Sequence, residues 1–223
     1  MGHVPHLVVP APWPEERLGL TAMQWRHLTK VLRVSPGEEV TYTDGRGRMG
    51  EGRLGNEEIE RGEEETRERE VEITVASAPP AGKDRQRFLV EKLAELGVAR
   101  LLWLETRHSA QRVASASKVV SWVLSAVEQS RGAFLMETIP DLVGWEELPR
   151  PYVVATPAGA PGPPSARTVV IGPEGGFAPD EVPPEAPTWF LGPTVLRVET
   201  AAVVAAARLM TPPIAIAGGE VPL

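Results

Sequence analysis

The sequence predicts an α/β protein with a small β-rich N-terminal domain and a larger C-terminal domain built on a mainly parallel sheet. In the first part, short strand-like runs are separated by turn signals such as Asp44-Gly45. In the second part, apolar strand-like runs alternate with amphipathic helical segments, the pattern of a parallel sheet. Between them, Pro79-Pro80-Ala81-Gly82 clusters residues that interrupt regular structure. We therefore predict one domain over residues 1–78 and another over 79–223.

The N-terminal elements follow from short apolar or alternating runs. Residues 21–34 predict a helix, with Thr21 as its N-cap and Ser35-Pro36-Gly37 as its end. The glutamate-rich stretch 57–70 predicts a solvated loop or hairpin. Short strands joined by turns favour a small barrel. The predicted strands are residues 7–9, 39–43, 46–54 and 71–76.

The C-terminal elements alternate regularly. Helices are predicted where apolar residues recur at helical spacing, as in residues 83–96, before Gly97. The other predicted helices are residues 117–129 and 200–210, and the predicted strands are residues 100–104, 152–155, 168–171 and 188–191.

Composition excludes several classes of protein. Hydrophobic residues make up 42% of the chain, enough for a core, and the absence of cysteine excludes disulfides and cysteine-bound metals. The four histidines show no metal-ligand spacing, so we expect no metal. No apolar run reaches the length of about 18 residues that a membrane span needs, and the N-terminus does not resemble a signal peptide. We expect a cytoplasmic protein that does not enter a membrane.

The net charge of −7 argues against a broadly basic surface, although it leaves room for a local one. Residues 1–75 carry ten Lys and Arg against fifteen Asp and Glu, much of the excess between Glu57 and Glu72. The remaining residues carry thirteen against fifteen. A basic patch for nucleic acid could therefore lie on either part.

Three predicted strands end in loops rich in glycine and proline. These ends are Ala155-Thr156-Pro157-Ala158-Gly159, residues 171–177 (IGPEGGF) and residues 191–200 (LGPTVLRVET). Ligands of open α/β sheets bind outside the carboxyl ends of the strands, and glycine lets a ligand approach the backbone. We therefore expect a binding site where the three loops meet.

The loops do not have the chemistry of a phosphate site. Neither the G-x-G-x-x-G nor the P-loop pattern is present, no lysine follows the glycines, and Glu174 would repel phosphate. A neutral or cationic ligand is favoured, and S-adenosylmethionine (SAM) has a sulfonium and no phosphate.

The pair IGPEGGF and LGPTVLRVETA, residues 171–177 and 191–201, closely resembles the small-subunit ribosomal RNA methyltransferase E family. These enzymes are uridine-N3 methyltransferases of the SPOUT superfamily. Two further segments, EKLAELGV at 91–98 and AVEQS at 126–130, resemble the helices of their catalytic domain. The segment HLTKVLRVSPGEEV at 27–40 resembles their small RNA-binding barrel, similar to the PUA fold.

The resemblance implies a C-terminal domain with a trefoil knot, a homodimer, and methylation of a uridine N3 in 16S rRNA or the assembled small subunit. It implies that SAM is bound by residues of the three loops. Carried over by position, these are Thr156, Ile171, Gly172, Glu174, Gly175, Gly176, Leu191, Gly192, Val195, Leu196 and Thr200.

Uridine N3 carries a proton and becomes a nucleophile when that proton is lost. Methylation there therefore requires either a base that removes the proton or a cation that stabilises the resulting anion. Arg197 and Glu199 are the candidate catalytic residues: Arg197 for the electrostatic role, and Glu199 as a base, as a substrate contact or as a helix cap. We assign no general base. The candidate RNA-binding residues are Arg26, Lys30, Arg33, Arg85 and Arg107.

Two alternatives stay open. The same fold could methylate transfer RNA, or it could serve as a non-enzymatic RNA-binding factor in ribosome assembly. The barrel-like segment argues against the first, and the intact loop sequences argue against the second.

Overall fold

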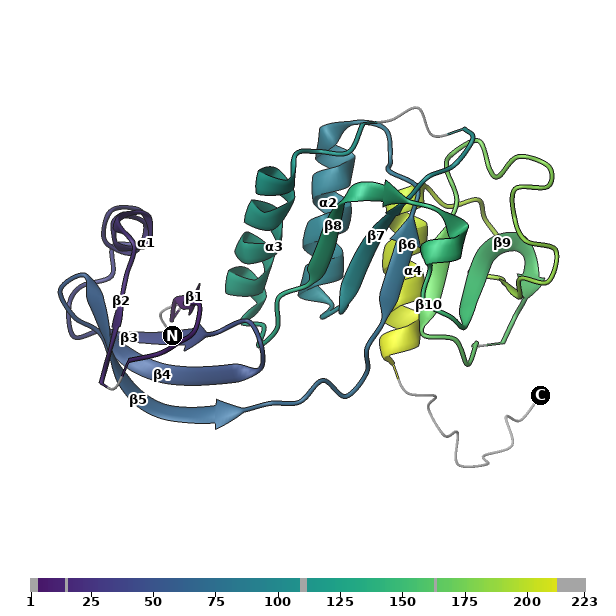
Figure 1. The fold of residues 1–223 in the computed structure, drawn as a ribbon. Coiled ribbons are helices and arrows are strands. Elements are labelled where there is room, and N and C mark those ends of the chain that lie inside the picture. The colour runs from purple at the N-terminus through teal and green to yellow at the C-terminus, as the bar shows by residue number, and fades with distance from the viewer. Residues whose placement is uncertain (1–3, 15, 109–111, 163, 212–223) are drawn as a thin grey trace, which may run out of the picture.

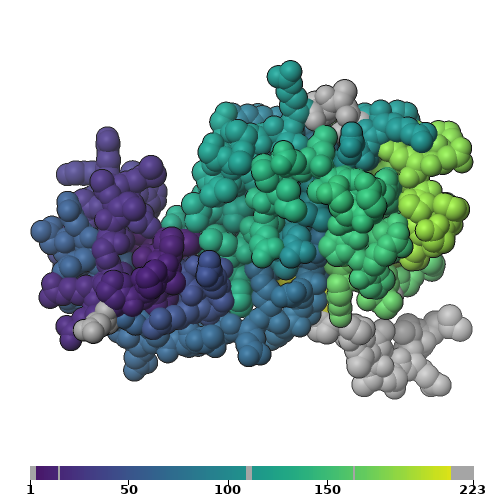
Figure 2. Space-filling view, viewed as in Figure 1, coloured from purple at the N-terminus to yellow at the C-terminus, as the bar shows by residue number. Residues whose placement is uncertain are grey.

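The computed structural model describes residues 4–14, 16–108, 112–162 and 164–211. These residues form two sheets, each with its own hydrophobic core, arranged as two lobes joined by an extended segment (Figures 1 and 2).

The N-terminal lobe contains a five-stranded sheet in the order β1-β3-β4-β5-β2. Strand β1 pairs parallel with β3, and the remaining pairs are antiparallel. Among the described residues no backbone pairing joins β1 to β2, so this sheet is open and the small barrel predicted from the sequence is not confirmed. The strands are β1 (His6–Val8), β2 (Arg17–Gly19), β3 (Glu39–Thr43), β4 (Arg48–Leu54) and β5 (Glu58–Thr66).

The helix predicted over residues 21–34 is present in two segments, α1 (Ala22–Arg26) and the π-helical η1 (His27–Val31). Thr21 caps it as expected: its Oγ1 accepts a hydrogen bond from the Gln24 backbone N–H at 3.2 Å. The change of geometry appears where the Leu32 N–H donates to the His27 carbonyl, five residues back.

The glutamate-rich stretch predicted as a solvated loop or hairpin forms the nine-residue strand β5, which lies between β4 and β2 and makes an antiparallel hairpin with β4. Its Ile59 is fully buried, and its Glu64 accepts hydrogen bonds from Arg61, Arg48 and the Tyr42 hydroxyl. The bond from Arg61 contributes most to holding the pKa of Glu64 below its usual range. Ion pairs between neighbouring strands thus stabilise a strand whose local composition is typical of a solvent-exposed segment.

The C-terminal lobe is built on a six-stranded, wholly parallel sheet in the order β11-β9-β10-β6-β7-β8. Its strands are β6 (Thr74–Ser77), β7 (Arg100–Leu104), β8 (Glu137–Val143), β9 (Tyr152–Ala160), β10 (Thr168–Ile171) and β11 (Thr188–Trp189). The run near residues 71–76 was expected in the N-terminal part, but β6 lies at the centre of this sheet. The domain limits themselves stay a prediction.

Helices cover one face of the parallel sheet (Figure 1). They are α2 (Lys83–Glu95), α3 (Ala116–Ser130) and α4 (Val198–Met210), which pack against Val75, Leu101 and Val169 of the strands. The intervening strand residues Ala76 and Val170 face the opposite side. That side is covered by the short 3₁₀ helix η2 (Trp145–Glu147) and by Phe177, Val182 and Ala186.

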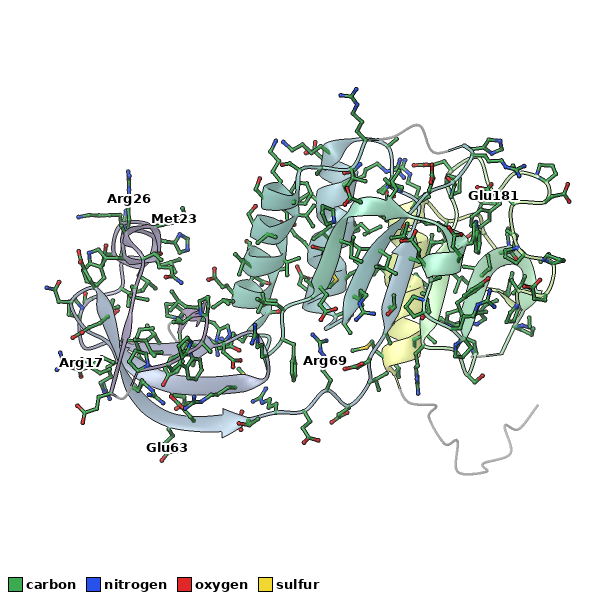
Figure 3. The ribbon with its side chains drawn as sticks, viewed as in Figure 1. Arg17, Met23, Arg26, Glu63, Arg69 and Glu181 are labelled. Carbon is green, nitrogen blue, oxygen red and sulfur yellow. The ribbon has the colours of Figure 1, made fainter. Side chains whose placement is uncertain are left out.

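Side chains of the first lobe contact the loop after α3. The His6 Nε2 lies 3.2 Å from the Gly132 carbonyl oxygen, and the Thr43 hydroxyl donates to the Ala133 carbonyl at 3.0 Å. In the joining segment, Arg69 donates to the carbonyls of Gly97 and Leu135 at 2.8 and 2.9 Å (Figure 3). These bonds fix the joining segment to the C-terminal lobe.

Within the described residues, no helix is long and apolar enough to cross a membrane. In the same part of the chain, no group of three or more His, Asp or Glu side chains is arranged to hold a metal ion.

Candidate functional site

A cavity of about 430 Å³ lies beside residues 155–157 of β9, at the carboxyl end of β10 and beside the loop that follows β11. All three segments predicted as loops contribute to it, but the first, residues 155–159, belongs to the strand β9 and is not a loop. Nine of the eleven predicted cofactor residues line its wall. They are Thr156, Ile171, Gly172, Glu174, Gly176, Leu191, Gly192, Val195 and Leu196.

Glycine is required at two positions of the loop after β10. A Cβ at Gly172 would lie 2.8 Å from the Phe177 ring, closer than carbon atoms can pack. Gly176 has a φ of +74°, in the left-handed region, and its N–H donates to the Pro173 carbonyl at 2.9 Å, which closes the turn. These two residues let the chain turn back and place Phe177 in the wall.

The wall is mostly apolar. Among its described residues Glu174 is the one charged side chain, and neither lysine nor arginine lines the cavity. Such a wall offers nothing to neutralise a phosphate. Its one carboxylate is paired with Arg85, which does not line the cavity, at 2.6 Å. Backbone groups and the Thr156 and Thr194 hydroxyls remain for polar recognition.

Aromatic side chains pack against Phe177 of the cavity wall. The Trp145 ring lies 5.4 Å from Phe177 and 5.9 Å from Tyr152, measured between centroids. Sequence reasoning missed this layer, and it also missed Ala178 and Val182 of the wall. The aromatic residues Trp145 and Phe177 follow the strands β8 and β10, which could have marked them as candidates for the wall. No local pattern, however, indicates that their rings pack together.

Two predicted cofactor residues lie outside the cavity wall. Gly175 points toward His108, since a Cβ there would lie 3.8 Å from the His108 Nδ1. Thr200 lies exposed in the first turn of α4. The structure therefore brings together the loop residues on either side of Gly175, and not Gly175 itself.

Glu199, predicted as catalytic, is buried and paired with Arg85. The Arg85 Nε donates to Glu199 Oε1 at 3.0 Å, and the Arg85 Nη2 donates to Oε2 at 2.6 Å. Burial alone would raise the pKa of Glu199, but these bonds outweigh it and hold the pKa below its usual range. An ionised, fully engaged carboxylate is a weak base, which favours the structural role over the catalytic one.

Arg197 is exposed and occupies the N-cap position of α4, directly after the third loop. Within the described part of the chain its guanidinium makes no hydrogen bond or ion pair, although its charge contributes to lowering the pKa of Glu199. Its positive charge is available to a ligand beside the cavity.

The predicted RNA-binding residues lie in three places. Arg26, Lys30 and Arg33 are exposed on the α1–η1 tip, where Arg26 and the exposed Met23 point outward (Figure 3). Arg107 is exposed, and its Nη1 donates to the Pro179 carbonyl at 3.2 Å. Arg85, in contrast, is committed to carboxylates beside the cavity.

The domain that carries this cavity matches a known family. A family model described as the RNA methyltransferase domain matches residues 67–150 and 153–210, from the joining segment to the end of α4. The chain belongs to this RNA methyltransferase family. The match contains β6 and all three cavity segments.

Solved structures resemble this RNA methyltransferase over nearly its whole length. One is a ribosomal RNA small subunit methyltransferase E from Neisseria gonorrhoeae bound to S-adenosyl methionine. It is 27% identical with a TM-score of 0.80, over 92% of this chain and 96% of that one. Another, from Legionella pneumophila in complex with SAM, is 25% identical with a TM-score of 0.80, over 93% and 97%.

Proposed function

We propose that this RNA methyltransferase transfers the methyl group of SAM to N3 of a uridine in 16S rRNA. The observation that carries the proposal is the cavity beside the parallel sheet, whose wall is mostly apolar, is free of lysine and arginine among its described residues, and holds one carboxylate, Glu174, that is paired with Arg85. The two similar proteins that bind SAM support the choice of ligand.

The cavity fits the cofactor in size and chemistry. Its volume of about 430 Å³ lies in the range of small-molecule sites. A Cβ at Gly176 or Gly192 would meet no atom within 4 Å, so the backbone there is open to a ligand. Backbone groups of residues 172–176 and 191–196 would hold SAM, which supplies an electrophilic methyl group when bound.

The remaining chemistry falls to the chain. Uridine N3 becomes nucleophilic when it loses its proton, and the resulting anion is shared with O2 and O4. The exposed guanidinium of Arg197 would stabilise that anion, while the proton passes to solvent. Glu199 would set the start of α4 through its pair with Arg85 rather than act on the uridine.

The substrate would be bound by both lobes. Arg26, Lys30 and Arg33 on the α1–η1 tip would contact phosphates, with Arg107 nearer the cavity. The N-terminal lobe would act as the PUA-like module. The cavity loops would form part of a trefoil knot, and two copies of the chain would form a homodimer in the cytoplasm.

The test is methylation by the purified protein with radiolabelled SAM. The acceptors are small ribosomal subunits from a strain that lacks the gene, and bulk tRNA. We expect label in 16S rRNA alone, and mass spectrometry should place the methyl group on one uridine N3. Label in tRNA would favour the first alternative. Binding of RNA without binding of SAM would favour an assembly factor.

A further inference from the structure

Arg85 joins two parts of the cavity that are far apart in the sequence. Its Nη1 lies 2.6 Å from Glu174 Oε1 in the loop after β10, and its Nη2 lies 2.6 Å from Glu199 Oε2 in the first turn of α4. Glu174 lines the cavity, and α4 begins directly after the third loop. One guanidinium therefore connects the second loop to the end of the third.

The three partners differ in how firmly the fold holds them. The Glu199 side chain is 9% exposed, the Arg85 side chain 27% and the Glu174 side chain 41%. Glu199 is fixed in α4, so the pair between Arg85 and Glu199 is anchored on a buried carboxylate. Glu174 is the most exposed of the three, and among the residues that the structure describes it is held, besides Arg85, only by a hydrogen bond of 3.4 Å that it accepts from the Ala81 N–H.

The adjacent Gln86 fixes the end of α2 from which Arg85 projects. Its Nε2 donates to the carbonyls of Pro80 and Arg112 at 3.2 and 3.0 Å, and its Oε1 accepts from the Ala114 N–H at 2.9 Å. Arg85 thus extends from a rigid support, and its planar guanidinium suits two carboxylates at once.

We infer that Arg85 is a positioning residue for the methyl donor: it holds the loop of residues 172–176 in its binding conformation by tying Glu174 to Glu199. This inference rests on the proposed function. It gives Arg85 a role beside the cofactor in place of the RNA contact that the sequence suggested. An ammonium in its place could reach one carboxylate but could not span both with the same geometry.

The experiment is calorimetric titration of the whole protein with SAM. We expect Arg85→Gln to weaken SAM binding about tenfold and Arg85→Lys to restore part of that affinity. The matched control is Arg87→Gln on the same helix, since Arg87 pairs with Glu91 at the surface and should leave the affinity unchanged. Wild-type affinity in Arg85→Gln would overturn the inference.

A double-mutant cycle separates positioning from direct contact. If Arg85 acts through Glu174, Glu174→Gln weakens SAM binding in the wild-type background and changes little when Arg85→Gln is already present. An equal weakening in both backgrounds would overturn the inference. Should Arg85→Gln fail to fold, Arg85→Met, which keeps the apolar length of the side chain and lacks its charge, replaces it in the cycle with the same two outcomes.

The two proposals fail differently. If the wild-type protein does not bind SAM, the proposed function is wrong. If the wild type binds SAM and the cycle is additive, the function stands and the role of Arg85 is wrong.

Discussion

At the scale of single residues, Arg197 combines exposure with a position directly after the third cavity loop. We predict that Arg197→Ala lowers the turnover number by about a hundredfold or more, because the variant lacks the charge that stabilises a developing anion. SAM affinity should stay close to the wild-type value, since Arg197 does not line the cavity. Initial rates of methylation and a calorimetric titration measure the two quantities.

Arg87→Ala provides the control for removing an exposed arginine of the same lobe. If Arg197→Ala instead weakened dimerisation or SAM binding and left the turnover number at saturating SAM unchanged, Arg197 would be an interface or cofactor residue.

Gly172 tests the shape of the cavity. A methyl group at this position would meet the Phe177 ring at 2.8 Å and push it from the wall. We therefore predict that Gly172→Ala weakens SAM binding by about tenfold or more, since overpacking a site typically costs about 1–3 kcal/mol. Gly162→Ala is the matched control, because a Cβ at Gly162 meets no atom within 4 Å. Equal affinities of the two variants for SAM would contradict the role given to Gly172.

Sequence reasoning reached most of the cavity wall because its residues lie in three short segments with marked composition. It did not separate Gly175 from its neighbours, since the direction in which each loop residue points depends on the turn. It did not predict the ion pairs of Arg85, whose carboxylate partners lie 89 and 114 positions away along the chain. No local pattern indicates such distant pairs.

At the scale of elements, α1 and η1 carry exposed cations on a lobe whose β5 is strongly acidic. We predict that Arg26→Ala combined with Lys30→Ala weakens RNA binding and lowers its salt dependence. The slope of log affinity against log salt should become shallower by about 0.7 for each phosphate that is no longer neutralised. Filter binding of 16S rRNA at several salt concentrations measures the slope.

Arg17→Ala on β2 is the control, since Arg17 is paired with Glu58 on the same lobe. A salt slope that stays at the wild-type value in the Arg26 and Lys30 variant would mean that RNA binds elsewhere.

Periodicity predicted the helices and the central strands well because their apolar faces meet one core. It did not decide between a loop and a hairpin for β5, since nine residues with five glutamates have the composition of a solvated segment until arginines of β4 and β2 lie opposite them. The π-helical geometry of η1 could not be predicted either, because residues 27–31 have the composition of an ordinary α-helix.

At the scale of the whole molecule, the contact between the lobes includes His6, and burial lowers the pKa of its ring below the ordinary value of 6.5. The positive charges of Arg131 and Arg67 act in the same direction, while the hydrogen bond to Gly132 opposes them. A histidine with a lowered pKa binds fewer protons when folded than when unfolded. Stability therefore decreases as the pH falls below about 6.5.

We predict that the free energy of unfolding falls less in His6→Gln than in the wild type between about pH 7.5 and about pH 5. Urea unfolding at several pH values measures this difference. Glu128 of the same contact has a pKa raised by burial and opposes the effect in both proteins, so the comparison isolates His6. Parallel curves for the two proteins would show that His6 is protonated equally in both states.

The central place of β6 limits how this enzyme can be shortened. Strands β10 and β7 both hydrogen-bond to β6, although it is the first strand of its sheet in the chain. Removal of residues 1–78 would remove β6. Strands β10 and β7 would then lack the neighbour between them, so each would have an unpaired edge and the apolar surface that β6 covers would be exposed. A fragment that begins at residue 67, where the family match begins, would keep that strand and the Arg69 anchor.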